Sequence, residues 1–173
     1  MTTIGVAIEV PEPYGEQLRA ARASFGDEMA ATVPSHITLI PPTPVPADEL
    51  DCFSGRLEQA AGHIGSYPLR LRGTGTFRPI SPVVFVAVSQ GISYTELLAK
   101  EVRSALGGTV PEAEFPFHPH VTVAHGVDEA SLDRAYEELA DFECRFRVDS
   151  FSLYHLTDDA GWVPQRDFPL RQT

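Results

Sequence analysis

Hydrophobic and polar positions alternate along the chain in a way that predicts short strands interrupted by amphipathic helices. In the first half we expect strand, helix, strand, helix and strand, in that order, at residues 3–10, 16–31, 36–40, 50–64 and 67–77. The helix over residues 50–64 is the best defined, because its apolar side chains recur every three or four positions. A proline-rich stretch at residues 41–46 follows the middle strand and predicts a loop.

The same order of elements returns in the second half. Residues 83–88 form a continuous apolar run that is typical of a buried strand. A capping-box pattern opens a helix over residues 93–106. The chain is then completed by a strand, a helix capped by Asp128 and two further strands, at about residues 120–124, 132–139, 142–156 and 162–170.

The order strand, helix, strand, helix, strand thus occurs twice, with a junction near residues 78–82. No low-complexity tract or flexible linker lies at this junction, which indicates that the two halves pack against one another. We therefore expect a single domain over residues 1–173, built from two pseudo-symmetric halves.

The middle strand of each half carries the same short motif. It is His36-Ile37-Thr38 in the first half and His120-Val121-Thr122 in the second. Residues two apart in a strand project from the same face, so each triplet presents an imidazole and a hydroxyl side by side. Two such strands related by a pseudo-two-fold axis would direct two imidazoles and two hydroxyls toward one space.

These four side chains suit the cleavage of a phosphodiester. One neutral histidine takes a proton from the attacking water, and one protonated histidine gives a proton to the leaving oxygen. The hydroxyls of Thr38 and Thr122 can hold the non-bridging phosphate oxygens. We predict His36 and His120 as the catalytic pair, with no metal or other cofactor. The pseudo-symmetry leaves open which histidine is the acid and which is the base.

Two segments resemble a known family. Residues 34–39 (PSHITL) and 117–124 (FHPHVTVA) are similar to the paired motifs of the 2H phosphoesterase superfamily, nearest to its 2′-5′ RNA ligase-like and cyclic phosphodiesterase branch. Residues 5–10 and 148–154 also resemble strands of that branch. The resemblance implies a bilobal α+β fold, with largely antiparallel sheets around a central cleft. It also implies activity on 2′,3′-cyclic phosphates or 2′-5′ linkages of nucleotides or RNA ends.

One position departs from the resemblance. Ligase-like members often carry an arginine shortly after the second motif, where this chain has His125. An imidazole gives a phosphate weaker and more pH-dependent help than a guanidinium does. His125 has an odd offset from His120 and would point away from it unless a bulge turns the strand. We retain His125 as a candidate substrate contact.

Three further residues are candidate substrate contacts. Phe77 and Arg78, at the junction, can supply a ring for base stacking and a cation for phosphate. Tyr154, on a strand near the C-terminus, can line the site. Trp162 and Phe168 are expected to pack in the interior instead.

The motifs leave two other functions open. One is a non-catalytic module that recognises a nucleotide or an RNA end with the same residues. The other is a zinc-dependent hydrolase built on His36, His118 and His120, since zinc prefers histidine and cysteine ligands. Neither Cys52 nor Cys144 has the spacing of a zinc ligand, and we expect both to be free thiols.

The charge of the chain limits its partners. Its net charge is −11 and its pI is about 4.8, whereas a broad grip on nucleic acid relies on lysine and arginine. We expect a small nucleotide or an RNA terminus as the partner, and no duplex DNA. No apolar run is long enough to span a bilayer and no secretory signal is visible. The expectation is a cytoplasmic protein without a membrane partner, most simply a monomer.

Overall fold

The computed structural model describes residues 1–172, which form four α-helices and eight β-strands. The helices are α1 (Tyr14–Ser24), α2 (Leu50–Gly62), α3 (Ile92–Leu106) and α4 (Glu129–Glu138). The strands are β1 (Thr2–Glu9), β2 (His36–Val45), β3 (Tyr67–Thr76), β4 (Val83–Gln90), β5 (His120–His125), β6 (Glu143–Val148), β7 (Ser150–Thr157) and β8 (Gly161–Pro169). A short 3₁₀ turn, η1 (Glu28–Ala31), follows α1.

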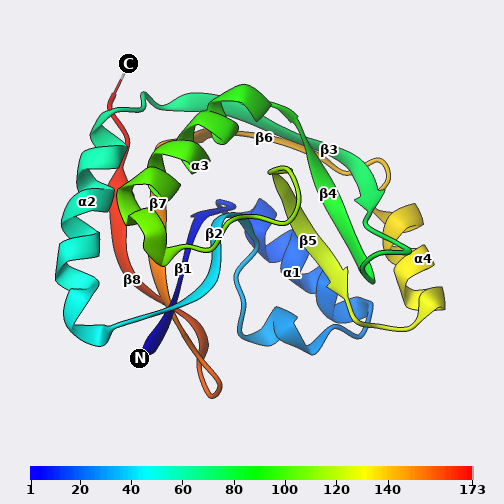
Figure 1. The fold of residues 1–173 in the computed structure, drawn as a ribbon. Coiled ribbons are helices and arrows are strands. Elements are labelled where there is room, and N and C mark those ends of the chain that lie inside the picture. The colour runs from blue at the N-terminus through cyan, green and yellow to red at the C-terminus, as the bar shows by residue number, and fades with distance from the viewer. Residues whose placement is uncertain (173) are drawn as a thin grey trace.

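The strands form two four-stranded sheets. The first sheet has the order β2-β1-β7-β8 and the second has the order β5-β4-β3-β6. Every pair of neighbouring strands is antiparallel. This arrangement confirms the predicted α+β class with largely antiparallel sheets. In Figure 1, β3 and β6 arch over the molecule, while β2 and β5 lie toward its middle.

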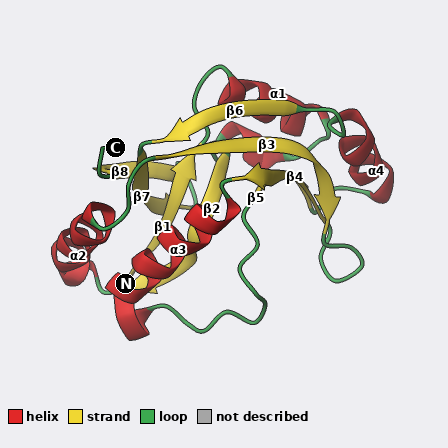
Figure 2. Cartoon of the chain, turned by 90° about the horizontal axis from the view of Figure 1, so that it is seen from above, coloured by secondary structure: helices red, strands yellow, loops and turns green. Residues whose placement is uncertain are grey.

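Both sheets are covered by helices. Helices α2 and α3 pack against the first sheet, and α1 and α4 pack against the second. Helix α1 leaves the first sheet after β1 yet contacts β5, and α3 leaves the second sheet after β4 yet contacts β2. Figure 2 shows α3 beside β2, and α4 beside β4. Each sheet is therefore covered partly by a helix that follows a strand of the other sheet.

The sheets combine segments from both sides of the junction at residues 78–82. Strand β3 precedes the junction but pairs with β4, which follows it. Strands β7 and β8, from the C-terminal part, complete the first sheet beside β1. One hydrophobic core of buried side chains extends through both sheets and their helices.

Several element boundaries differ from the sequence prediction. The helix expected over residues 16–31 ends at Ser24, because Gly26 adopts a φ of 85° and the chain turns before η1. Strand β2 continues through the prolines at positions 41–44. It is an edge strand and pairs only with β1, so its outer side needs no backbone donors. The strand expected over 142–156 is two strands, β6 and β7, which belong to different sheets.

The two predicted helix caps have different outcomes. The carboxylate of Asp128 accepts a hydrogen bond from the backbone N–H of Ser131, which confirms the cap of α4. The capping box expected at residues 93–96 is wrong. Helix α3 begins at Ile92 behind Gly91, whose φ of 92° makes the turn without a side-chain cap. Thr95 instead lies buried inside the first turn, where its hydroxyl donates to the carbonyl of Gly91.

Candidate active site

The two motif strands lie against each other. Strands β2 and β5 are the edge strands of their sheets, and they are in contact. His36 opens β2 and His120 opens β5. The residue after each histidine, Ile37 or Val121, is fully buried. The histidines and the motif threonines are only partly buried, on the opposite face of their strands. The two sheets therefore bring both copies of the motif to one place.

Each histidine is fixed by the same local hydrogen bond. The Nδ1 atom of His36 lies 2.7 Å from the carbonyl oxygen of Pro34. The Nδ1 atom of His120 lies 2.6 Å from the carbonyl oxygen of His118. Because a carbonyl only accepts, Nδ1 must carry the proton and donate it. In the neutral ring Nε2 is then the basic nitrogen in both residues, which leaves it available for proton transfer.

Burial makes both imidazoles hard to protonate. Burial, which has the largest effect, and the nearby positive charges of Arg22 and His120 together lower the pKa of His36 to about 4, against the favourable bond to the Pro34 carbonyl. Burial also lowers the pKa of His120, again opposed by its carbonyl partner, with a smaller contribution from the charge of His118. A positive charge on His120 thus lowers the pKa of His36, as expected for two imidazoles that face the same space.

Aromatic side chains surround the two histidines. The ring of Trp162 lies over that of His36, with centroids 4.2 Å apart and planes inclined at 34°. The ring of His120 meets Phe77 at 5.0 Å, edge to face, and Phe85 at 5.1 Å. A third imidazole, that of His118, lies 6.0 Å from His120 and touches the same two phenyl rings. The sequence placed Phe77 at this site but assigned Trp162 to packing.

Comparison with protein-family models decides the affiliation of the chain. The model described as the 2′-5′ RNA ligase superfamily matches residues 10–160, which contain both histidine motifs. This chain belongs to that superfamily. Membership supports a general phosphodiesterase function, as the sequence motifs predict.

Individual relatives of the superfamily match over nearly their whole length. A Bacillus anthracis (strain A0248) protein named "Putative phosphoesterase" is 27% identical over 169 residues, which cover 96% of each chain. Among solved structures, E. coli LigT complexed with 3′-AMP superposes with a TM-score of 0.68 at 22% identity and 98% coverage of both chains. The protein TT0787 of Thermus thermophilus superposes with a TM-score of 0.67 at 23% identity and the same coverage. These structures share the fold described above.

A β-bulge follows the motif in both strands. In β5, Thr122 and Ala124 pair with the adjacent residues Phe85 and Val84 of β4, so β5 contains one extra residue. Val123 and Ala124 are consequently both buried, and the exposed His125 returns to the face of His120. Strand β2 has the same irregularity, since Thr38 and Ile40 pair with the adjacent residues Ala7 and Val6 of β1. Because of the bulge in β5, His125 lies on the same face as His120 although it is five residues further along the chain.

A buried ion pair supports this end of β5. The carboxylate Oδ2 of Asp27 accepts from Arg22 Nε at 2.7 Å and from the backbone N–H of His125 at 3.0 Å. Arg22 is only 6% exposed, and its charge is the one that disfavours protonation of His36. Within residues 1–172, the hydrogen bonds of its guanidinium involve only Nε. The superfamily resemblance did not point to Arg22, because helix α1 carries no motif.

Two other predicted contacts are engaged with the protein. The guanidinium of Arg78 is paired with Glu129 at 3.0 Å and Asp133 at 2.9 Å, both on α4. Tyr154 is buried, and its hydroxyl donates to Glu9 at 3.5 Å. Burial, and next the charge of Glu9, raise the pKa of this phenol. Its ring also meets that of Trp162, with centroids 5.5 Å apart, so Tyr154 supports the residue that covers His36.

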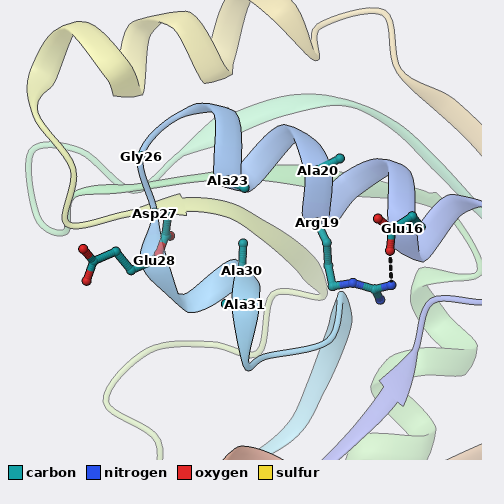
Figure 3. Close-up of a pocket in the computed structure, with 9 residues that line it drawn as sticks. All are labelled: Glu16, Arg19, Ala20, Ala23, Gly26, Asp27, Glu28, Ala30 and Ala31. Carbon is teal, nitrogen blue, oxygen red and sulfur yellow. Dashed lines mark hydrogen bonds and ion pairs between the residues drawn. The ribbon is translucent and has the colours of Figure 1, made fainter.

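Two surface pockets lie outside the histidine pair. The larger, of about 580 Å³, lies between α1 and η1 and is lined by Glu16, Arg19, Asp27, Glu28 and several alanines. Figure 3 shows Arg19 turned toward Glu16 within it. The smaller, of about 220 Å³, is lined by residues 9–12 and by Ser150, Ser152 and Asp167. Both pockets carry carboxylates, so neither resembles a phosphate site.

The described part of the chain has neither grouped metal ligands nor a membrane-spanning helix. Across residues 1–172, no three or more histidine, cysteine, aspartate or glutamate side chains are grouped as metal ligands would be. None of the helices there has the length and apolar character needed to cross a membrane. Cys52 is exposed and Cys144 is buried, and neither forms a disulfide.

Proposed function

We propose that this member of the superfamily hydrolyses 2′,3′-cyclic phosphates, or cleaves 2′-5′ linkages, at the ends of nucleotides or RNA. The observation that carries the proposal is the matched pair of imidazoles. His36 and His120 make the same Nδ1 hydrogen bond and stand on edge strands that meet. Each therefore offers Nε2 to a phosphate held between them. The protein acts in the cytoplasm as a monomer, without a metal.

The reaction of a cyclic phosphate needs one proton to be removed and one to be supplied. As the water oxygen bonds to phosphorus, one Nε2 takes the proton of that water. As the bond from phosphorus to the ribose 2′ or 3′ oxygen breaks, the other imidazole donates its proton to that oxygen. One proton is taken from water and one is given to the leaving oxygen. The two histidines therefore end with their protonation states exchanged, and proton exchange with the solvent restores the starting states.

The surroundings of the two rings favour different roles. His36 has a pKa of about 4 and lies near the cation Arg22, so it is neutral and suited to act as the base. His120 lies against phenyl rings, and burial is the main influence on its pKa. A bound phosphate anion stabilises the protonated form of a neighbouring imidazole. We therefore assign His36 as base and His120 as acid.

The threonines and His125 would hold the phosphate. Within residues 1–172, neither the Thr38 nor the Thr122 hydroxyl has a hydrogen-bond partner, so both can donate to non-bridging oxygens. His125 shares the face of Thr122 beyond the bulge and can add a further donor. Phe77 and Trp162 offer ring surface for a base on either side. The protein E. coli LigT has been crystallised with 3′-AMP, ATP and NADP⁺, which supports a small nucleotide as ligand.

The test is hydrolysis of the four 2′,3′-cyclic nucleotides in excess EDTA. We expect turnover, and a fall in kcat of about 10²-fold or more for His36→Ala and for His120→Ala. His63→Ala is the matched control, because His63 is an exposed histidine at the end of α2. Unchanged turnover in either site variant would overturn the mechanism. Activity that EDTA abolishes would favour the zinc hydrolase, and nucleotide binding without turnover would favour the binding module.

A further inference from the structure

Four arginines stand together on the second sheet. Arg70 and Arg72 lie on β3, and Arg145 and Arg147 lie on β6. They are four of the thirteen lysine and arginine residues in a chain whose net charge is −11. We call this group the arginine row. Neither the sequence motifs nor the proposed chemistry uses it.

The arginine row shares a face of the sheet with His120. Leu71 of β3 pairs with Val88 of β4, and the neighbouring Ala87 pairs with His120 of β5. Adjacent residues of a strand point to opposite faces, whereas directly paired residues share a face. Leu71 therefore lies on the face opposite His120. The ladder shifts register between Leu71 and Arg70, and the extra residue lies on β4, between Val88 and Gln90. Strand β3 keeps its alternation there, so Arg70, the neighbour of Leu71, lies on the face of His120.

The regular ladder between β3 and β6 extends this assignment to the whole row. Arg70 pairs with Arg145, and Pro68 pairs with Arg147, without a register shift. Arg72 lies two residues beyond Arg70 and pairs with Glu143. All four arginines thus lie on the histidine face. With strands about 4.8 Å apart, β3 and β6 lie roughly 10 and 14 Å from β5 across the sheet.

The other face of the sheet is covered. Thr74 pairs with Val86, which puts it opposite His120, and its hydroxyl donates to the carbonyl of Tyr136 in α4. The arginines on the histidine face remain accessible. Their side chains are 28% exposed for Arg70, 47% for Arg72, 68% for Arg145 and 48% for Arg147.

Positive charge exceeds negative charge along the row. Glu143 pairs with Arg70 at 2.8 Å, with Arg72 at 3.0 Å and with Arg145 at 3.6 Å. Three guanidinium groups thus share this one carboxylate. Arg147 lies 4.0 Å from Asp149 and also donates to the hydroxyl and to the carbonyl oxygen of Ser66, each at 3.2 Å. The first sheet has the opposite character beside its histidine, because Glu9 pairs with His36 and lines an acidic pocket with Asp167.

We propose that the arginine row binds the phosphates of a single-stranded RNA whose cyclic end occupies the histidine site. This inference rests on the proposed function of that site and names its substrate class, an oligonucleotide in preference to a mononucleotide. Guanidinium groups hold phosphates through paired hydrogen bonds, and a row of them can follow a chain of phosphates. The carboxylates of Glu9 and Asp167 on the first sheet repel the phosphates, so the RNA leaves the site over β3 and β6.

The test compares two substrates that share the reacting group. One is a 2′,3′-cyclic mononucleotide, and the other is a pentaribonucleotide ending in the same cyclic nucleotide. For the double variant Arg72→Ala/Arg145→Ala we expect kcat/KM on the pentaribonucleotide to fall about tenfold. The mononucleotide value should stay within about twofold, because single-strand phosphate contacts are absent from it. The salt dependence of the pentaribonucleotide reaction should also weaken.

Two matched variants separate the row from general charge effects. Arg56→Ala removes an exposed arginine of α2, on the other sheet, and should leave both substrates unchanged. Glu143→Gln removes the carboxylate that neutralises the row and should strengthen pentaribonucleotide binding. Arg145→Ala alone, at the most exposed position, should retain part of the effect if the double variant unfolds.

The outcomes also separate this inference from the proposed function. If both substrates lose activity equally in the double variant, or if neither does, the arginine row does not bind RNA. If the unaltered protein hydrolyses neither substrate, the proposed chemistry fails. Fluorescence anisotropy with a labelled pentaribonucleotide ending in a 3′-phosphate then tests RNA binding by the arginine row independently of catalysis. Weaker binding in the double variant supports the row, and unchanged binding overturns it.

Discussion

The indole of Trp162 covers the imidazole of His36, with ring centroids 4.2 Å apart. Trp162 comes from β8, and its backbone N–H donates to the carbonyl of Thr32, just before β2 begins. This hydrogen bond joins the β7–β8 turn to the segment that leads into the first motif. The orientation of His36 therefore depends on a residue at the far end of the chain.

Removing the indole should impair catalysis. Aromatic pairs contribute about 0.5–1.5 kcal/mol beyond burial, so Trp162→Ala should lower kcat roughly three- to tenfold by loosening His36. Trp162→Phe keeps a ring and should recover most of the activity. Steady-state kinetics on a cyclic nucleotide measure both variants. Full activity of Trp162→Ala would show that the indole does not position His36.

The dependence of kcat/KM on pH should be bell-shaped with its maximum on the acid side of neutrality. As the proposed base, His36 must be neutral, so activity should fall as the pH drops through its pKa of about 4. As the proposed acid, His120 must be protonated, so activity should fall as the pH rises through its pKa, which burial holds below the ordinary 6.5. Rates measured from pH 4 to pH 9 test this. A rate that rises steadily above pH 7 would contradict the assignment of roles.

Acidification should destabilise the protein through His36. In the unfolded chain its pKa returns to the ordinary 6.5, so the unfolded state binds a proton between that value and about 4 while the folded state does not. Stability is then full above pH 6.5 and declines as the pH falls, by up to about 3 kcal/mol from this residue. Urea unfolding at pH 7 and pH 5 measures the loss. The loss of stability should be smaller in His36→Gln. An equal loss in this variant would show that protonation of His36 is not its cause.

Breaking the ion pair between Arg22 and Asp27 should have two effects. Arg22→Ala leaves a buried carboxylate without its cation, which costs about 3–5 kcal/mol of stability. It should also raise the pKa of His36, because the positive charge that disfavours its protonation is gone. Thermal unfolding and the histidine signals in NMR titrations measure the two effects. Arg22→Lys should keep the pKa of His36 low, and a shift equal to that of Arg22→Ala would exclude charge as the cause.

Gly75 holds a ring of the site in place. A Cβ atom there would lie 2.5 Å from the ring of Phe85, which in turn contacts His120. Gly75→Ala should therefore cost about 1–3 kcal/mol and displace the ring. In Gly55→Ala the added methyl meets nothing within 4 Å, and this residue lies within α2, where alanine is favoured. Thermal melts of the pair should shift in opposite directions, and equal shifts would contradict the packing argument.

Local patterns in the sequence were sufficient for the strands and helices that bury one face, and for the pairing of the two histidine motifs. They were not sufficient where the local structure depends on a neighbouring strand. Whether β2 tolerates its prolines depends on its lying at a sheet edge, which no local pattern reveals. The bulge that returns His125 to the face of His120 depends on the register with β4.

The sequence patterns also did not predict the side chains that reach the site from distant segments. Trp162 and Arg22 have no motif, and each approaches His36 only because the sheets and helices meet there. Arg78 follows a predicted strand and has the right charge for phosphate, yet its ion pairs with Glu129 and Asp133 depend on where α4 packs. The function of such a residue can be inferred only from the tertiary structure, because its neighbours come from another part of the chain.

The first sheet joins the two ends of the chain. Thr3 pairs with Leu156, and β8 follows at the outer edge. During synthesis the strand that carries His36 is made early, but its sheet can close only after β7 and β8 have left the ribosome. The second sheet can assemble sooner, because its strands lie between Tyr67 and Val148. A nascent chain can thus form the sheet of His120 before the sheet of His36, and the first sheet is complete only once β7 and β8 have been made.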